Sequence, residues 1–343
     1  MKVLIPGRIL ARHVGGNTTY ARNIAAGLER RGHTVASIPH GRHPLTTAIS
    51  ENRVGLSRGD HGDLIHYVAD TGPIIRTKRP SLVTVHGVAS RWEHGIRNRR
   101  QEFVWRSRVA RAIKSTNRVI TVSQSSASDI AEIFDIEASS IDVIYHGIDV
   151  DKFSTPAELS PELSEKLPSD YILYLGNIEP RKNIVELVRA MLHRDVATLG
   201  IPLVIAGKPA WNSAASMKMI ESAKNVIYLG FVSDSDRAAL MQRAALFVFP
   251  SRYEGFGFPV LEALAAGTGV LTSARGALAE VAGPSGILSD LSADAIADGI
   301  IHTLADEAGL AEQSLQGREW ASRFNWDRSV DQHIRSYEEV LST

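Results

Sequence analysis

Short apolar runs of four or five residues recur along the chain, with glycine-containing loops and amphipathic stretches between them. Such runs are typical of strands buried on both faces of a parallel sheet. In the first half they predict strands at 2–6, 34–38, 64–68, 81–85, 118–122 and 141–145. In the second half they predict strands at 171–175, 202–206, 225–229, 245–249 and 269–272. Helical patterns separate many of these runs, among them 18–31, 129–134, 184–192 and 234–243.

The alternation of strands and helices predicts an α/β protein with two doubly wound domains of similar construction. At 343 residues the chain is long enough for two separate cores. The segment 155–169 has three prolines and mixed charge, which is typical of a linker. We therefore expect a first domain at 1–155 and a second at 156–319. The segment 40–62 is polar and irregular, and its pattern does not assign it to a helix or a strand.

Composition narrows the range of functions. The formal net charge is zero, so no overall basic field argues for a nucleic-acid partner. The chain has no cysteine, which excludes disulfides and thiolate metal sites and fits a reducing cytoplasm. The N-terminus starts directly as a strand, and no apolar run is long enough to span a bilayer. We expect a cytoplasmic protein that is soluble or, at most, peripheral at the inner face of a membrane.

The densest chemical signal is the stretch 245–267, which reads ALFVFPSRYEGFGFPVLEALAAG. Its apolar start predicts a buried strand, and the following loop carries Gly255 and Gly257, which let the backbone approach a bound group closely. Pro259 suits the first position of a helix, and Gly267 suits its end. A strand, a glycine loop and a helix N-terminus together predict a phosphate site, because free amides and the helix dipole favour an anion there.

Two cations precede this stretch in an equivalent loop. Arg181 and Lys182 lie in GNIEPRKN, between a predicted strand and a predicted helix. In a parallel sheet both loops open at the same edge, so the cations and the loop amides can converge on one anion, such as a diphosphate. Gly176 and Gly207 end two of the strands, and we count them among the donor-binding residues. Because nothing here is a strong nucleophile, we expect the site to stabilise a departing diphosphate.

Two carboxylates bracket the glycine loop. Glu254 lies beside the amides of Gly255, Phe256 and Gly257, where it could orient a sugar. Glu262 falls in the predicted first turn of the helix, where it could accept hydrogen bonds from the two neighbouring hydroxyls of a ribose. Taken singly, either could be an ordinary carboxylate at the start of a helix. Their spacing, together with the cation pair, favours a site.

The first half offers weaker candidates. Gly15 and Gly16 precede a predicted helix and form either an anion site or only a tight turn. His86 ends a predicted strand at the edge where open α/β sheets bind ligands, although it could equally be a hydrogen-bonded structural residue. Two Asp-x-Asp motifs, 149–151 and 234–236, are common coincidences in charged loops, so we expect no metal site.

The segment 91–118 is strongly basic. It has nine lysines and arginines against Glu93 and Glu102, and its apolar positions indicate an amphipathic helix over part of it. One interpretation is a solvated helix face. The other is a patch for an anionic acceptor or for anionic lipid, which would bring the protein into peripheral contact with a membrane.

These motifs resemble those of the retaining, nucleotide-sugar-dependent glycosyltransferases of family four, which have the GT-B fold. Glu254 and Glu262 match the E-x7-E pair of that family, and PSRYEGFGFPVLEALAAG resembles its signature. GNIEPRKN resembles its diphosphate loop, VIYHGIDVDKF its entry into the second domain, and Gly15-Gly16 its first glycine loop. The resemblance is specific over about residues 140–285 and generic before them.

The resemblance implies two Rossmann-like domains that face each other across a cleft. The first domain would bind the acceptor and the second the donor, with a C-terminal helix at 320–343 packed back on the first. Neither a metal nor another cofactor would be required. Arg181 and Lys182 would bind the donor diphosphate, Glu262 the ribose, and Glu254 the donor sugar, while His86 resembles the family histidine near that sugar.

This sequence also departs from the family pattern. Gly269 and Ala279 stand where the family usually has proline. The family arginine often lies earlier in the phosphate loop, which leaves open whether Arg181 contacts phosphate directly.

The reaction implied is transfer of a hexose, with a mannose type as the first choice, from a GDP- or UDP-linked donor to an acceptor hydroxyl with retention. The acceptor would belong to a polysaccharide, glycolipid or glycoside, and could be lipid-linked or anionic. Two other functions stay open on the same fold: a sugar-nucleotide epimerase and a non-catalytic protein that binds nucleotide sugars. A Rossmann oxidoreductase is disfavoured, because the first strand is followed by PGRIL and not by Gly-x-Gly-x-x-Gly.

Overall fold

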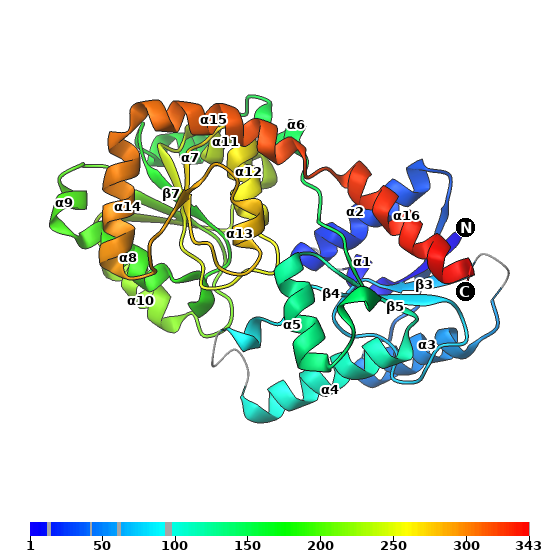
Figure 1. Ribbon diagram of the computed structural model, residues 1–343. Helices are drawn as coiled ribbons and strands as arrows, with labels where there is room; N and C mark the ends of the chain where they lie inside the picture. The colour runs from blue at the N-terminus through cyan, green and yellow to red at the C-terminus, as the bar shows by residue number, and fades with distance from the viewer. Residues whose placement is uncertain (12–14, 42, 60–62, 93–97, 343) are drawn as a thin grey trace. The chain divides into compact units, whose positions relative to one another are not determined.

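The computed structural model describes residues 1–11, 15–41, 43–59, 63–92 and 98–342 (Figure 1). Its contacts divide the chain into two compact units. Unit 1 consists of Met1–Gly147 and Trp326–Thr343, and unit 2 consists of Ile148–Asn325. Each unit contains a six-stranded sheet in which all strand pairs are parallel, with helices on both faces. The predicted α/β class with two doubly wound sheets is confirmed.

The sheet of unit 1 has the strand order β2-β1-β3-β4-β5-β6. Its strands are β1 (Lys2–Pro6), β2 (Thr34–Ile38), β3 (Asp63–Tyr67), β4 (Ser81–Val85), β5 (Arg118–Thr121) and β6 (Ile141–Val143). Its helices are α1 (Gly7–Leu10), α2 (Gly16–Arg30), α3 (Pro44–Leu56), α4 (Arg99–Ser115), α5 (Gln124–Phe134) and α16 (Trp326–Ser342), with short 3-10 turns η1 (Ala89–Arg91) and η2 (Ala138–Ser140).

The sheet of unit 2 has the order β12-β11-β10-β7-β8-β9. Its strands are β7 (Ile172–Leu175), β8 (Leu203–Ala206), β9 (Val226–Gly230), β10 (Leu246–Phe249), β11 (Val270–Thr272) and β12 (Gly286–Ile287). Its helical elements are α6 (Val150–Ser154), α7 (Pro161–Lys166), η3 (Pro180–Lys182), α8 (Ile184–Leu192), α9 (Arg194–Ala197), α10 (Ala214–Ser222), α11 (Asp234–Arg243), α12 (Phe258–Ala266), α13 (Leu278–Val281), α14 (Ala293–Ala305) and α15 (Glu307–Ser322).

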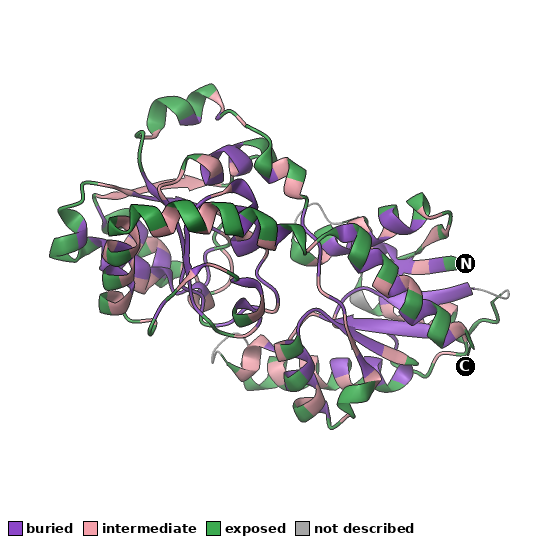
Figure 2. Cartoon of the chain, turned by 45° about the horizontal axis from the view of Figure 1, so that its top comes forward, coloured by how far each residue is buried: buried purple, intermediate pink, exposed green. Residues whose placement is uncertain are grey.

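Apolar runs form the central strands because both faces of each sheet are covered by helices. Every residue of β3, β4, β7, β8 and β10 is buried, and Figure 2 shows most strand residues as buried and the outer helix faces as exposed. In unit 1, α2 and α16 lie on one side of the sheet, and α3 and α4 lie on the other (Figure 1). The strands predicted from the sequence agree with the observed ones to within about two residues at each end.

Helix α16 packs against α2 within unit 1. A Cβ atom at Gly27 would lie only 2.4 Å from Cγ2 of Val330, so the absence of a side chain at Gly27 lets the two helices meet closely. Arg31, just after α2, donates to Asp331 at 2.6 Å and to Asp327 at 3.2 Å. The sequence placed the start of this C-terminal segment at 320, whereas unit 1 resumes at Trp326.

The expected linker is wrong. The segment 155–169 is no linker: it belongs to unit 2, where Pro161 opens α7 and Ser160 N donates to Asp236 Oδ1 at 2.8 Å. The chain instead passes between units at 147/148 and again at 325/326. The segment 40–62, which the sequence left unassigned, contains α3 (Pro44–Leu56).

Candidate active site

The loops after β7 and β10 meet at the carboxyl edge of the unit 2 sheet. The two strands are neighbours in that sheet, so both loops leave it on the same side. Arg252 N donates to the carbonyl of Arg181 at 2.7 Å, and the Arg252 guanidinium donates to Asn183 Oδ1 at 2.7 Å. The structure thus brings the predicted cation loop and the predicted glycine loop together.

Four charged side chains form a cluster between these loops. Lys182 Nζ lies 2.5 Å from Glu254 Oε1, and Arg181 Nη1 lies 2.7 Å from Glu254 Oε2. Arg181 also pairs with Glu179 at 2.6 Å, and Ser251 Oγ donates to Glu254 Oε1 at 2.6 Å. Two cations and two carboxylates therefore balance in charge. We expected Glu254 to face a sugar, and in this structure it neutralises both cations; Glu179 and Ser251 are members that the sequence did not reveal.

Burial makes the electrostatics of this cluster strong. Glu254, Lys182 and Glu179 are all less than a tenth exposed. Burial raises the pKa of Glu254, but attraction by Arg181 and Lys182 outweighs burial and lowers that pKa to about 2. Burial and the neighbouring Arg181 charge lower the pKa of Lys182 from its ordinary value, against the attraction of Glu254. The Lys182 ammonium also lies 4.6 Å from the centre of the Phe249 ring, a cation–π contact that helps to hold it.

Two glycines are required by the backbone around this cluster. A Cβ atom at Gly207 would lie 1.9 Å from the carbonyl oxygen of Gly176, so the loops after β7 and β8 can approach only without it. Gly257 has a φ of 119° at the N-cap of α12, a conformation that favours glycine. The donor-binding roles of Gly176, Gly207, Gly255, Phe256 and Gly257 stay predictions.

Glu262 lies deeper in its helix than we expected. Helix α12 begins at Phe258, which makes Glu262 its fifth residue, and the first turn contains no acidic residue. The expectation that Glu262 sits in the first turn is therefore wrong, because the helix starts one residue before Pro259. Glu262 is buried and ion-paired with Arg237 of α11. Sequence reasoning missed Arg237, since only the packing of α11 on α12 brings these residues together.

His86 directly follows β4 in unit 1. Its backbone N–H donates to Asp70 Oδ1 at 2.9 Å, and its Nε2 lies 3.2 Å from the Val68 carbonyl, a contact that places a proton on Nε2. Gly15 is the N-cap of α2, with a φ of 127°, and its carbonyl accepts from the amides of Thr18 and Thr19. The turn at Gly15-Gly16 is thus observed, while its role in binding an anion is untested.

Beside His86, unit 1 contains a buried cluster of histidines and tyrosines. Tyr20 Oη lies 2.7 Å from His333 Nε2 and 2.9 Å from Thr84 Oγ1. His66 Nδ1 lies 2.7 Å from Tyr337 Oη. Burial lowers the pKa of His66 well below its usual range and lowers that of His333 to about 4, so both are neutral near pH 7. The sequence could not reveal this cluster, because its members come from distant parts of unit 1.

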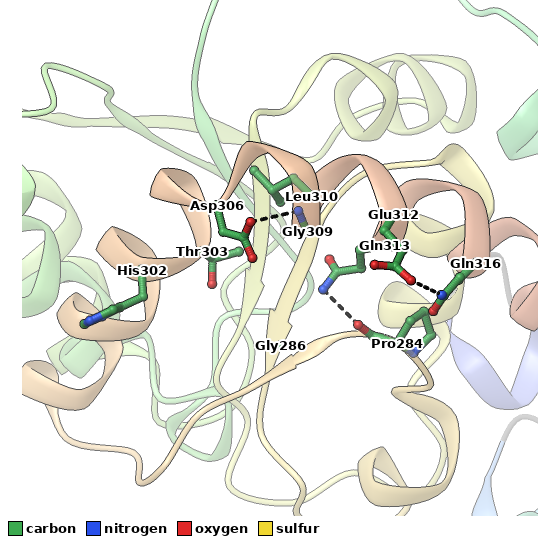
Figure 3. Close-up of a pocket in the computed structure, with 10 residues that line it drawn as sticks. All are labelled: Pro284, Gly286, His302, Thr303, Asp306, Gly309, Leu310, Glu312, Gln313 and Gln316. Atoms are coloured by element: carbon green, nitrogen blue, oxygen red, sulfur yellow. Dashed lines mark hydrogen bonds between the residues drawn. The ribbon is translucent and has the colours of Figure 1, made fainter.

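Other features carry less chemistry. A pocket of about 430 Å³ lies between α14, β12 and α15 (Figure 3). None of the residues that line it belongs to the two loops that carry the charge cluster. Its polar side chains serve the local structure: Asp306 caps α15 through Gly309 N, and Gln313 Nε2 donates to the Pro284 carbonyl at 2.9 Å. Across the described ranges, no group of three or more metal-ligating side chains is present, and none of the helices is long and apolar enough to cross a bilayer.

Two family models match the chain. The model described as "Glycosyl transferases group 1" matches residues 157–320, which include the charge cluster and both α11 and α12. The model described as "Glycosyltransferase Family 4" matches residues 58–152, which include His86.

Curated relatives carry the names of sugar transferases. The O-antigen chain mannosyltransferase B of Escherichia coli is 33% identical over 66% of this chain and 61% of its own length. The MMP alpha-(1->4)-mannosyltransferase of Mycolicibacterium hassiacum is 28% identical over 87% of this chain and 76% of its own length. The aligned region thus spans about three fifths of the first relative, and only 29% of a serotype-specific mannosyltransferase, WbdA, of Escherichia coli.

Solved structures share the fold. A sucrose-phosphate synthase from Thermosynechococcus elongatus aligns over 99% of both chains with a TM-score of 0.77 and 21% identity. The Anabaena protein HepE, solved in complex with UDP-glucose, aligns over 98% of this chain and 100% of its own with a TM-score of 0.73 and 18% identity. The two family models and the mannosyltransferase relatives together show that this chain belongs to the glycosyltransferases of the family-four type, and the solved structures show that it has the GT-B fold.

Proposed function

We propose that this glycosyltransferase moves a mannose-type hexose from a nucleoside-diphosphate sugar to an acceptor hydroxyl, with retention of configuration. The observation that carries the proposal is the cluster of Arg181, Lys182 and Glu254 beside the glycine loop and the start of α12. Its cations, loop amides and helix N-terminus suit a diphosphate. The mannose type is supported by the names of the relatives, and the GDP- or UDP-linked donor by the resemblance and by the UDP-glucose bound to HepE.

In this proposal, Glu254 holds the two cations in place until the donor arrives. Phosphate oxygens then replace the carboxylate as partners of Lys182 and Arg181, and Glu254 turns to the hydroxyls of the donor sugar. While Glu254 pairs with the two cations its pKa is about 2, so in that state it is ionised and accepts hydrogen bonds. Glu262 would bind the ribose hydroxyls while Arg237 fixes its carboxylate.

Charge on the leaving diphosphate increases as the glycosidic bond breaks. Arg181, Lys182 and the amides of Gly255–Gly257 would stabilise that charge, and one such donor is typically worth about 2.7–4 kcal/mol of barrier. Because these cations supply the positive charge, we expect turnover to persist in EDTA. A front-face route, in which a leaving phosphate oxygen takes the acceptor proton, fits a site without a strong nucleophile. The roles of His86 near the transferred sugar and of Gly15-Gly16 on the acceptor side remain predictions from the resemblance.

The test is a panel of GDP- and UDP-sugars, each with and without simple glycoside or lipid-linked acceptors. The proposal predicts acceptor-dependent release of nucleoside diphosphate, and a product whose anomeric configuration by NMR matches the donor. Conversion of the donor without any acceptor would identify an epimerase instead. Binding of donor without release under all conditions would identify a non-catalytic binding protein.

A further inference from the structure

The exposed large apolar side chains of unit 1 are unevenly distributed. Within its described part they belong to α3, α4 and adjoining segments, namely Leu45, Ile49, Leu56, Ile74, Ile75, Trp92, Phe103 and Val104. Phe103 is 73% exposed and Leu45 is 78% exposed. Helices α2 and α16, on the other side of the sheet, contribute none to this set. An apolar excess on one side only points to an interaction surface.

The contributing elements form one continuous surface. Val54 of α3 and Val109 of α4 pack on the same core cluster, so the two helices cover the same face of the sheet. The segment 74–78 joins them, because Ile75 N donates to Asn52 Oδ1 of α3 at 3.1 Å and Thr77 N donates to the Ser115 carbonyl of α4 at 3.0 Å. We call α3, residues 74–78 and α4 the basic-apolar face.

Helix α3 has an apolar side that faces outward, in addition to Val54, which packs on the core. Leu45, Ile49 and Leu56 lie on one side of the helix by their spacing, and all three are exposed. Thr47 and Glu51 are buried instead, and Glu51 is satisfied by an ion pair with Arg8 at 2.6 Å. A helix that directs apolar residues outward and buries a carboxylate is arranged for contact with something other than water.

The same face is rich in exposed cations. These are Arg53, Arg76, Lys78, Arg99, Arg100, Arg108, Arg111 and Lys114. Arg100, Phe103, Val104, Arg111 and Lys114 recur at helical spacing, which places them on one side of α4. The acidic residues of these helices are engaged, since Glu102 pairs with Arg106 at 2.6 Å and Glu51 pairs with Arg8. The face is therefore positive although the whole chain has no net charge.

We propose that the basic-apolar face docks the protein on an anionic phospholipid bilayer. Lysine and arginine would meet the phosphate groups, while Phe103 and the aliphatic side chains enter the boundary between headgroups and acyl chains. Apolar side chains that are spaced along two helices, with cations between them, suit a fluid surface better than a protein partner, which would require a contiguous apolar centre. The charged sugar–phosphate backbone of a nucleic acid would leave most of these apolar side chains without an apolar partner. This surface goes beyond the basic segment of α4 and beyond the proposed transfer reaction, and it would bring unit 1 to lipid-linked acceptors.

The experiment is co-sedimentation of the full chain with vesicles. Phosphatidylcholine vesicles are compared with vesicles of phosphatidylcholine and phosphatidylglycerol in equal parts. We expect binding only to the anionic vesicles, and loss of binding as salt is raised, because salt screens charges at an exposed surface. Equal binding to both compositions, or no binding to either, would overturn the proposal.

Variants locate the contact. The charge reversal Arg108→Glu/Arg111→Glu should weaken vesicle binding by at least tenfold, and Phe103→Ser by several-fold. The matched controls lie in unit 2: Lys218→Glu/Lys224→Glu reverses two exposed cations, and Leu315→Ser replaces a side chain that is 73% exposed, like Phe103. Both controls should bind as the wild type does.

Folding and chemistry are followed separately. Circular dichroism and thermal unfolding should show that all four variants are folded. Turnover with a water-soluble acceptor should be unchanged in them, so that a failure of the transfer reaction is distinguishable from a failure of docking. Wild-type vesicle binding by folded Arg108→Glu/Arg111→Glu and Phe103→Ser variants would overturn the assignment of this face.

Discussion

Each unit contains a buried polar cluster on its sheet, and the two clusters are opposite in kind. In unit 2, Arg181, Lys182 and Glu254 are ionised and pair with one another. In unit 1, His66, His333 and their tyrosine partners are neutral and joined by hydrogen bonds. Both clusters are sequestered from water, so the difference lies in whether charge is retained.

Retained charge is costly, because each buried ion loses hydration that its partners only partly replace. Buried cations that are neutralised by carboxylates at a sheet edge therefore suit an anionic ligand. Such a ligand would replace a carboxylate as the partner of the cations. A neutral network has no such cost and is suited to holding elements together: His333 and Tyr337 of α16 bond to Tyr20 of α2 and His66 of β3. We therefore propose that the first cluster serves binding and catalysis and that the second holds the elements of unit 1 together.

The largest expected effect is on turnover. Lys182→Ala removes a buried donor to the leaving diphosphate, so kcat should fall by about 10²- to 10³-fold. Release of nucleoside diphosphate measures it, with Lys218→Ala, an exposed lysine of α10, as the control. If folded Lys182→Ala turns over at the wild-type rate, the charged cluster is no donor site and the contrast between the clusters fails.

The second effect is on stability and concerns the neutral cluster. Burial holds the pKa of His333 near 4 in the folded state, below the ordinary value of 6.5. Between these values the unfolded chain takes up a proton that the folded chain does not, so stability falls as pH falls from about 6.5 towards 4. For His333 alone, this loss would amount to up to about 3 kcal/mol as pH falls from 6.5 to about 4.

Urea denaturation at a series of pH values measures this loss. His333→Gln should unfold with a shallower dependence on pH than the wild type, because one of the suppressed protonations is gone. His302→Gln is the matched control, since His302 is exposed on α14 and should leave the dependence unchanged. Identical pH profiles for the wild type and His333→Gln would show that this histidine is no part of a proton-excluding network.

A third prediction sharpens the role of Glu254. Glu254→Gln leaves Arg181 and Lys182 with one carboxylate fewer, so a nucleoside diphosphate should bind about tenfold more tightly, or about 1.4 kcal/mol. Turnover should nevertheless fall, because the contact with the donor sugar is weakened. Isothermal titration calorimetry gives the first quantity and product release the second. Weaker binding of the diphosphate to Glu254→Gln would mean that the carboxylate does not compete for the cations.

The smallest expected effect is a loss of nucleotide affinity, opposite in sign to the gain expected for Glu254→Gln. Glu262→Gln should weaken nucleotide binding by up to about tenfold, because a neutral amide accepts hydrogen bonds from ribose hydroxyls less strongly than a carboxylate. Calorimetry with a nucleoside diphosphate and its 2′-deoxy form measures it. The variant should lose the preference for the ribose form, and an undiminished preference would remove Glu262 from the ribose site.

Much of this arrangement was predictable from local patterns. Apolar runs placed the strands, and the order strand, loop, helix placed Arg181 and Glu254 at one sheet edge. Contacts between side chains were not predictable, because the pairing of Glu254 with both cations and of Arg237 with Glu262 depends on tertiary packing. The same holds for the neutral cluster, whose parts come from both ends of the chain.

The errors have identifiable physical causes. Helix α3 escaped prediction because its apolar residues lie on two sides of the helix: Leu45 and Ile49 are exposed, whereas Val54 packs on the core, so the sequence shows no single apolar face. The linker was misplaced because prolines were taken as signs of an irregular segment, whereas Pro161 serves as the first residue of α7.

The central claim is that Arg181 and Lys182 hold a diphosphate, and one measurement tests it most directly. Calorimetry would compare the affinities of the wild type and Lys182→Ala for a nucleoside diphosphate and for the matching monophosphate, using whichever base the donor panel identifies. The account predicts that the variant loses at least tenfold in affinity for the diphosphate and much less for the monophosphate. Equal losses for the two ligands, or none for either, would contradict the assignment of this cluster as the diphosphate site.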